Sequence, residues 1–302
     1  MLFPTQEIGS LPKPKNLKGN TASLYNIKFL EDVGLDYIYD GEAQRIEMYE
    51  YPARYIEGMK IQDWIRSWDN KYYRKASCVG ELKLKELYHL NEFEFVRNNT
   101  TRNIKIPVTG PYTMMDWSYN ENYSRYDLAM SFAKNIIRPN LKALVKAGAK
   151  WIQIDEPAAT TKSNEIPLVI DSFNEAVKGV DCKISIHICY SDYSILYPEI
   201  LDMNTSHLAL EYANKNNYDE MFKLYKEYNE SREIGLGVLD VHSDVIESPE
   251  LIRDRIVHAH SSLNNTIYVN PDCGLRTRRH TVVEQKLRNM VEGAKLARDI
   301  YE

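Results

Sequence analysis

The sequence predicts a (β/α)₈ barrel formed by the whole chain, residues 1–302, as a single domain. Short apolar runs alternate with longer amphipathic stretches, and eight of these runs have the length and composition of strands. Residues with reactive side chains lie at the carboxyl ends of the runs. In a barrel these ends converge on one face, whereas in an open sheet the first and last would usually lie far apart. The eight runs cover residues 4–10, 35–42, 105–111, 151–157, 183–190, 207–213, 234–243 and 266–274.

Amphipathic helices are predicted between the strand runs, most clearly over residues 128–149, 218–229 and 281–301. The helix after the seventh run begins with Ser248-Pro249-Glu250, which supplies an N-cap residue, a first-turn proline and an acidic side chain near the positive helix end. Residues 43–102 break the alternation, because they hold few strand signals but many aromatic and charged residues. We therefore expect an insertion between strands 2 and 3, near the barrel mouth, rather than a second domain.

Composition and charge exclude several classes of protein. The 302 residues carry a formal net charge of −5 and contain no run of five or more basic residues, so we expect no nucleic-acid partner. No stretch approaches the roughly twenty apolar residues of a membrane span, and the N-terminus lacks the pattern of a secretory signal. The four cysteines are too sparse for a disulfide framework. A cytoplasmic protein without a membrane partner is therefore expected.

Four residues of metal-binding types lie at the ends of predicted strands. His187 and Cys189 are two residues apart on one strand, so their side chains point the same way. Glu211 and Cys273 end two other strands. Two thiolates, one imidazole and one carboxylate are a suitable tetrahedral set for Zn²⁺. A disulfide between Cys189 and Cys273 is the alternative, but it leaves His187 and Glu211 unexplained.

Other polar residues at strand ends suit binding or acid–base chemistry. Glu42 and Asp155 could together receive an ammonium group, as an amino-acid substrate requires, although each could equally be a helix cap or part of a surface turn. His242 suits general acid or ion-pair work, and its alternative is a core histidine with satisfied hydrogen bonds. Trp117 could stack on a flat ligand at the barrel mouth, although packing is the default role of an indole.

The chain resembles the catalytic half of cobalamin-independent methionine synthase over residues 5–300, because its motifs occur in the same order as in that family. Two of them, HICYS and VNPDCGL, are specific, whereas IGS alone would be weak. The motifs are EIGSLP, DGEAQR, VTGPYTMMDWSY, IQIDEPA, HICYSDY, ALEYA, GVLDVHS and VNPDCGLRTR.

The resemblance implies an activity and a set of site residues. The activity is zinc-dependent transfer of a methyl group to the thiol of L-homocysteine, which forms L-methionine. His242 matches the family's proton donor, and Trp117 its pterin-stacking tryptophan. The implied zinc ligands are His187, Cys189, Glu211 and Cys273. The implied homocysteine site contains Ile8, Gly9, Ser10, Glu42 and Asp155.

Two departures from the family bear on the methyl donor. The full-length family enzyme carries a second, N-terminal barrel, which we do not expect in this chain, and Thr161 stands where the family tends to place a pterin-contacting glutamate. The chain is instead similar to the short, single-barrel "core" methionine synthases of archaea and some bacteria. The expected donor is therefore methylcobalamin, a corrinoid protein or a methyl-pterin.

Three alternative functions remain open from the sequence. A thiol alkyltransferase acting on coenzyme M would use the same zinc–thiol chemistry, but its sulfonate substrate has no amino group for Glu42 and Asp155 to bind. A structural zinc protein would use the four-residue site only to stabilise the fold. A third alternative is a subunit that serves mainly to dock a corrinoid protein or an activating protein.

Overall fold

A six-stranded parallel sheet forms most of the barrel wall in this computed structural model, which describes residues 1–66, 72–189 and 191–301. Its strands follow the order β11-β10-β9-β8-β7-β5, so neighbours in the chain are also neighbours in space. The strands are short and almost wholly buried, as in parallel sheets that helices cover from outside. Their bounds are β5 Ile106–Thr109, β7 Trp151–Asp155, β8 Lys183–Ile188, β9 His207–Leu210, β10 Glu233–Leu239 and β11 Ile267–Pro271.

Shorter strand pairings complete the barrel wall. Strand β4 (Asn103–Ile104) directly precedes β5 and pairs in parallel with β1 (Tyr37–Ile38). Gln6 forms a parallel bridge to Tyr37 of β1, and Thr5 forms one to Val269 of β11. The regular ladders alone do not close, but with these single bridges each of eight parallel segments has two neighbours. The predicted (β/α)₈ barrel is therefore the fold of the chain.

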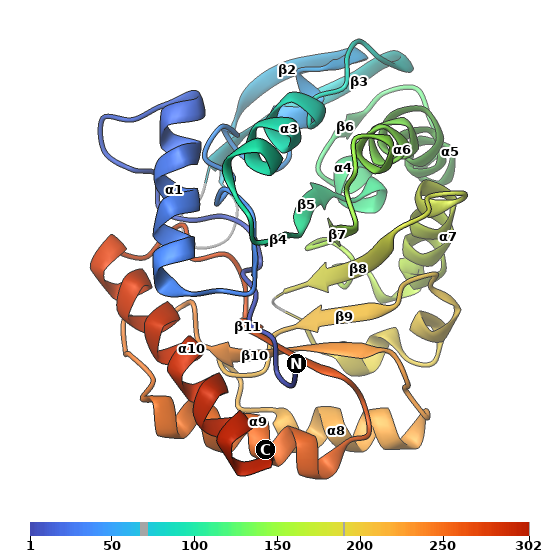
Figure 1. Cartoon of the computed structure of the whole chain (residues 1–302). Coiled ribbons are helices and arrows are strands. Elements are labelled where there is room, and N and C mark those ends of the chain that lie inside the picture. The colour runs from blue at the N-terminus through green and yellow to red at the C-terminus, as the bar shows by residue number, and fades with distance from the viewer. Residues whose placement is uncertain (67–71, 190, 302) are drawn as a thin grey trace.

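Helices cover the outside of the barrel, with α1 beside α10 and α9 beside α8 (Figure 1). Ser248 caps α9 as predicted, because its side chain accepts a hydrogen bond from the backbone N–H of Leu251. Two 3₁₀ turns follow β8, so the expected helix of that unit is missing from the described chain. The main helices are α1 Gly19–Val33, α3 Leu90–Asn99, α5 Arg125–Ser131, α6 Arg138–Lys146, α7 Ile166–Val177, α8 Tyr218–Glu227, α9 Pro249–Ser262 and α10 His280–Tyr301.

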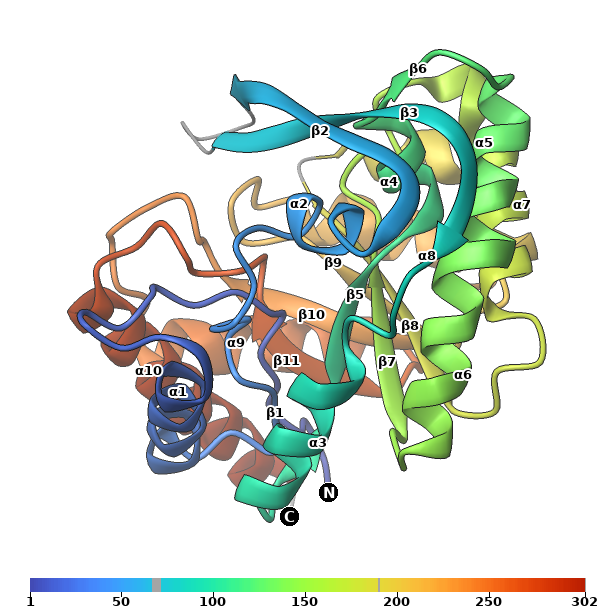
Figure 2. The same cartoon turned by 90° about the horizontal axis from the view of Figure 1, so that it is seen from above.

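The interval 43–102 contains two long strands that the sequence did not indicate. Strand β2 (Ile56–Arg66) pairs antiparallel with β3 (Tyr72–Leu84), and β6 (Tyr119–Asn120) adds a short parallel strand. Strand signals are few in this interval because β2 is largely half-exposed and lacks a buried apolar run. The short helices α2 (Glu50–Ala53) and α4 (Pro111–Asp116) lie nearby, and Figure 2 shows the hairpin at the opposite end of the barrel from the chain termini.

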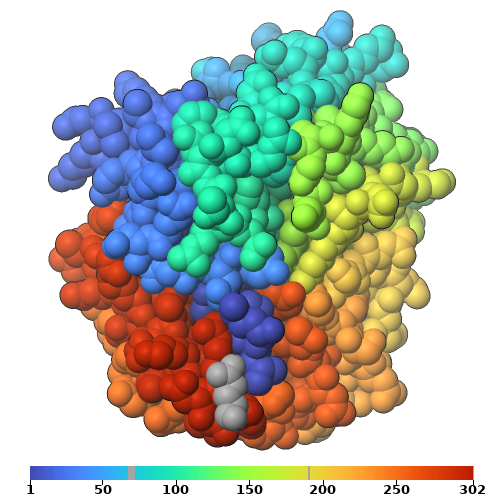
Figure 3. Space-filling view, viewed as in Figure 1, coloured from blue at the N-terminus to red at the C-terminus, as the bar shows by residue number. Residues whose placement is uncertain are grey.

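The barrel interior at the end near the termini is filled and polar. The Gln6 amide donates a hydrogen bond to Asn270 Oδ1 at 3.0 Å and contacts His207 Nε2 at 3.3 Å, and all three side chains are buried. Figure 3 shows the N-terminal residues (dark blue) packed across the middle of this face. Because the end near the termini is filled, the end that carries the hairpin is the one where a cavity can form.

No helix in the described ranges is long and apolar enough to cross a membrane.

Candidate metal and substrate site

Three of the predicted metal ligands come together at the hairpin end of the barrel. One ligand atom each of His187, Cys189 and Cys273 lies within 4.8 Å of the other two, so the group could hold a metal ion. His187 belongs to β8 and Cys189 follows its last residue, whereas Cys273 follows β11. Both sulfurs are thiols rather than a disulfide, which rules out the covalent alternative. The carboxyl ends of two strands therefore build the group, as expected for a barrel.

The His187 ring has the orientation of a metal ligand. Its Nδ1 donates a hydrogen bond to the carbonyl of Ala209 at 2.9 Å, which leaves Nε2 for another partner. Nε2 is buried and has no hydrogen bond of normal geometry among the described residues. Burial acts to lower the pKa of His187, but the neighbouring Cys273 sulfur and Asp155 raise it to about 9. A buried nitrogen beside two sulfurs is a donor set that fits a soft or borderline metal ion.

Glu211 and His242 lie next to each other, and Glu211 is not part of this group of three. Glu211 Oε1 is 3.5 Å from His242 Nε2, and its Oε2 accepts a hydrogen bond from the Asn214 amide at 3.0 Å. The Glu211 side chain is fully buried, whereas His242 is about one-fifth exposed. Asp240 Oδ1 accepts a hydrogen bond from the backbone N–H of His242 at 2.8 Å, which fixes this turn.

A cavity of about 280 Å³ opens beside the His187 group, and nine of the eleven predicted site residues line it. Glu211 and His242 are not in its described lining. The cavity is large enough for a small amino acid together with part of a second reactant. The nine residues are Ile8, Gly9, Ser10, Glu42, Trp117, Asp155, His187, Cys189 and Cys273.

The Glu42 carboxylate lies against the turn that contains Gly9. A methyl group built on Gly9 would lie 2.7 Å from Glu42 Oε1, so glycine is needed for this approach. Glu42 has a left-handed backbone conformation, with φ of 55°. Lys13 Nζ donates hydrogen bonds to the carbonyls of Glu42, Ala43 and Arg45, and thereby fixes the backbone of this loop. The position of Glu42 at the cavity thus depends on an exact fit between two loops.

Asp155 ends β7 and is buried at the same cavity. Its Oδ1 accepts a hydrogen bond from Gln153 Nε2 at 2.7 Å. Burial raises the pKa of Asp155 to about 7; His187 opposes this rise and the charge of Glu42 adds to it. A cationic group placed between Asp155 and Glu42 would offset the effect of the Glu42 charge and favour the ionised form of Asp155.

Three aromatic side chains, Tyr72, Tyr73 and Trp117, also line the cavity and are called the aromatic wall below. The rings of Tyr73 and Trp117 are stacked, with centroids 5.2 Å apart and an angle of 24° between their planes. Tyr73 belongs to β3 of the hairpin and Trp117 follows α4, so two loops of the barrel meet here. The wall could receive a flat or apolar ligand.

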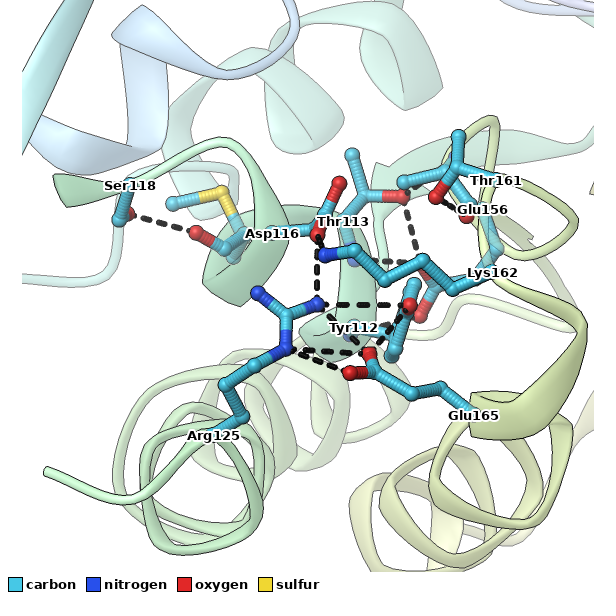
Figure 4. Close-up of polar contacts among 11 residues, drawn as sticks. Tyr112, Thr113, Asp116, Ser118, Arg125, Glu156, Thr161, Lys162 and Glu165 are labelled. Atoms are coloured by element: carbon cyan, nitrogen blue, oxygen red, sulfur yellow. Dashed lines mark hydrogen bonds and ion pairs between the residues drawn. The ribbon is translucent and has the colours of Figure 1, made fainter. Parts of the chain in front are cut away.

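Charged side chains fix the loop that carries Trp117 (Figure 4). Arg125 bonds Asp116 and Glu165, each at 2.6 Å, and Lys162 bonds Asp116 at 2.8 Å. Asp116 directly precedes Trp117, and Lys162 directly follows Thr161. The network therefore joins the loop after β5 to the loop after β7, beside the aromatic wall.

Several cavity residues have no counterpart among the sequence predictions. Tyr73 was missed because the hairpin was not recognised. Gln153 is not in the described lining but supports it through its hydrogen bond to Asp155. It was missed although it lies two residues before Asp155, on the same face of β7, and this spacing is the signal that could have found it. The other lining residues that were not predicted are Ile46, Glu47, Met48, Tyr72, Pro157, Gly274, Arg276 and Thr277.

The fold and the site define a barrel enzyme whose reactive groups converge at the carboxyl ends of the strands, around a potential metal site. Residues 13–296 match the family model described as "Cobalamin-independent synthase, Catalytic domain". The chain belongs to this family, as the sequence motifs predicted.

Relatives of similar length include proteins named methionine synthase from three archaea. The chain is 42% identical to that of Thermoplasma volcanium, with 95% of each chain covered. It is 43% identical to that of Thermoplasma acidophilum, covering 95% of this chain and 96% of the relative. It is 39% identical to that of Pyrococcus furiosus, covering 100% of this chain and 94% of the relative.

Solved structures agree with this assignment. A B12-independent methionine synthase from Shewanella sp. W3-18-1, in complex with selenomethionine, superposes with a TM-score of 0.91 at 26% identity. That alignment covers 100% of this chain and 99% of the other. A methyltransferase from Methanosarcina mazei has a TM-score of 0.72 at 12% identity, covering 100% of this chain and 95% of the other, which shows a shared fold alone.

Proposed function

We propose that this chain transfers a methyl group to the thiol of L-homocysteine and so forms L-methionine. The observation that carries the proposal is the position of a His–Cys–Cys group and two carboxylates in one cavity. Family membership and relatives named methionine synthase support it. The sulfur and imidazole ligands suit a thiol substrate, and the carboxylates suit its ammonium group.

Glu42 and Asp155 bind the ammonium group of homocysteine in this proposal. Both are buried acidic side chains at the cavity, so a cation there gains charge-assisted hydrogen bonds. The turn of Ile8, Gly9 and Ser10 forms the adjacent wall and offers backbone groups to the substrate. A thiol substrate whose acidic group is a sulfonate, without an ammonium group, would leave the two carboxylates facing each other. This geometry favours homocysteine over coenzyme M.

The proposed metal is Zn²⁺, bound by His187, Cys189 and Cys273, with Glu211 as the fourth ligand. A bound Zn²⁺ would supply the Lewis acidity that keeps the substrate thiol deprotonated at neutral pH. Glu211 is buried and contacts His242 and Asn214, so this carboxylate would keep polar partners if a substrate sulfur replaced it at the metal. Cys189 and Cys273 add negative charge, which keeps the substrate sulfur nucleophilic.

His242 and the aromatic wall serve the methyl donor. With a methyl-pterin donor, the departing nitrogen gains from a proton that His242 could provide through a relay. With a methyl-corrinoid donor, no proton is needed, and His242 orients Glu211 instead. Trp117 and Tyr73 offer the donor an apolar aromatic surface.

The experiment that tests the proposal is an assay of methionine formation from homocysteine, with methylcobalamin and with methyltetrahydrofolate in separate reactions. Activity with one donor fixes the donor class. The control is Cys189→Ser, which is expected to abolish turnover with either donor. If neither donor supports turnover and zinc-loaded protein also fails to bind homocysteine, the proposed function is wrong.

A further inference from the structure

A buried hydrogen-bond chain runs through the barrel interior and ends at the cavity. Lys105 Nζ donates to Gln153 Oε1 at 2.6 Å. Gln153 Nε2 donates to Asp155 Oδ1 and to the carbonyl of Ile8, each at 2.7 Å. Lys105 is 1% exposed and Gln153 is fully buried. These hydrogen bonds therefore join the buried Lys105 amine to acceptors on two residues that line the substrate cavity.

The orientation of the Gln153 amide follows from its neighbours. Asp155 Oδ1 and the Ile8 carbonyl are acceptors, so they require the NH₂ side of the amide, which has two protons to donate. The opposite oxygen then faces Lys105, which donates to it whether charged or neutral. A flipped amide would place its oxygen against two other oxygens and leave no donor for either. Lys105 therefore locks Gln153 in the one orientation that binds both acceptors.

We propose that Lys105 and Gln153 are positioning residues that preset Asp155 and the Ile8 carbonyl to receive the ammonium group of the substrate. The inference rests on the proposed function, since it assumes an α-amino thiol in this cavity. Gln153 occupies one side of each acceptor and so directs the remaining acceptor positions toward the ligand. A thiol without an amino group would leave both acceptors without their full set of hydrogen bonds. The hydrogen-bond chain from Lys105 to Asp155 therefore favours binding of an amino acid.

The buried amide layer deeper in the barrel offers a comparison. Gln6 is as buried as Gln153, and its amide also donates to a neighbouring side chain, Asn270. Asn270 and His207, which the Gln6 amide contacts, are not among the described residues that line the cavity. The Gln6 side chain is therefore a matched control for the general cost of removing a buried amide from this barrel.

The test measures binding of two thiols to zinc-loaded protein by calorimetry, so it does not depend on the methyl donor. The thiols are L-homocysteine and 4-mercaptobutanoate, which lacks only the amino group. Gln153→Met is expected to weaken homocysteine binding roughly tenfold to a hundredfold, as for the loss of hydrogen bonds to a charged group, and to leave 4-mercaptobutanoate binding within about twofold. Gln6→Met is expected to leave the ratio of the two affinities unchanged.

Each other outcome rejects a defined part of the reasoning. If Gln153→Met lowers the affinity for both thiols by the same factor, or lowers neither affinity, the residue has no positioning role. If Gln6→Met changes the ratio as much as Gln153→Met does, the effect is not specific to the chain that ends at the cavity. If Gln153→Met does not fold, as judged by circular dichroism, Lys105→Met tests the same link and is expected to shift the ratio in the same direction. If wild-type protein does not prefer homocysteine, the proposed substrate itself is wrong.

Discussion

The substitution Gly9→Ala is expected to weaken homocysteine binding by displacing the Glu42 carboxylate. The added methyl carbon would lie 2.7 Å from Glu42 Oε1 and 3.5 Å from Pro107 Cγ. The distance to Pro107 Cγ is an ordinary van der Waals contact. The distance to Glu42 Oε1 is too short for a carbon and an oxygen that are not bonded to each other. Gly9 has no left-handed backbone conformation, so alanine is not strained by its own φ.

The Glu42 side chain must therefore move to make room. Its backbone cannot follow, because Lys13 binds the carbonyls of Glu42, Ala43 and Arg45. The displaced atom is the free end of the Glu42 side chain, so the cost lies at the low end of the range for overpacking, about 1 kcal/mol. The KM for homocysteine is therefore expected to rise about 5-fold, since each 1.4 kcal/mol is a factor of ten.

The matched control is Gly80→Ala in β3, where an added methyl group meets nothing within 4 Å. Steady-state kinetics against homocysteine, with the donor saturating, measures the change, and thermal unfolding verifies that each variant is folded. Gly80→Ala is expected to leave the KM unchanged. A Gly9→Ala enzyme with the wild-type KM would refute the assignment of Glu42 to the ammonium group.

Three further predictions concern the metal, the donor and the pH dependence of stability. Cys273→Ser is expected to lower zinc affinity at least tenfold in a competition titration with a chromophoric chelator, because it replaces a soft thiolate ligand. Tyr73→Ala is expected to raise the KM for the methyl donor roughly 2-fold to 10-fold and to leave homocysteine binding unchanged, because it removes one partner of an aromatic stack. Burial acts to raise the pKa of Glu92, but Arg45 holds it well below its ordinary value of 4.5. The ionised pair therefore stabilises the fold above pH 4.5, and this contribution is lost as the pH falls below that value. Glu92→Gln is thus expected to destabilise the protein by about 3–5 kcal/mol at pH 7 in urea unfolding, and by less at pH 3.5.

Each of these three predictions has a clear contrary result. Cys182→Ser is the control for the metal titration, since Cys182 is outside the cavity lining, and equal zinc affinities of the two variants would contradict the ligand assignment. A parallel rise in both KM values for Tyr73→Ala would show that the hairpin affects the whole cavity rather than the donor side. A Glu92→Gln penalty that does not shrink at low pH would show that packing, not charge, dominates at that position.

The barrel itself was predictable because its strands are buried on both faces. Strands such as β7 and β8 appear in the sequence as short apolar runs that end in polar residues, and this pattern is typical of parallel sheets covered by helices. The first run was expected to be a strand over residues 4–10, but only Thr5 and Gln6 form bridges there. Pairing of such short segments depends on neighbouring strands, which local sequence does not encode.

The hairpin was missed for a related reason. Strand β2 alternates between half-exposed and exposed residues, so its pattern is that of a polar surface segment. Its stability comes from β3 and from the barrel mouth, including the stack of Tyr73 on Trp117. Contacts of this kind join residues far apart in the chain, and single-sequence periodicity carries no information about them.

The site was predictable to the extent that it consists of strand ends. His187, Cys189 and Cys273 meet because parallel strands deliver their carboxyl ends to one face. The place of Glu211 relative to this group could not be derived, since its side chain also contacts His242 and Asn214. Gln153 was missed because an amide has no metal-binding or acid–base chemistry of its own, so only its position two residues before Asp155 marked it.

The central claim is that the substrate sulfur binds a metal ion held by His187, Cys189 and Cys273. X-ray absorption at the zinc edge, on reconstituted protein with and without homocysteine, tests it most directly. The claim predicts one additional sulfur at about 2.3 Å and the loss of one oxygen when homocysteine is added. An unchanged set of ligands in the presence of saturating homocysteine would contradict the claim and would leave the metal with a structural role.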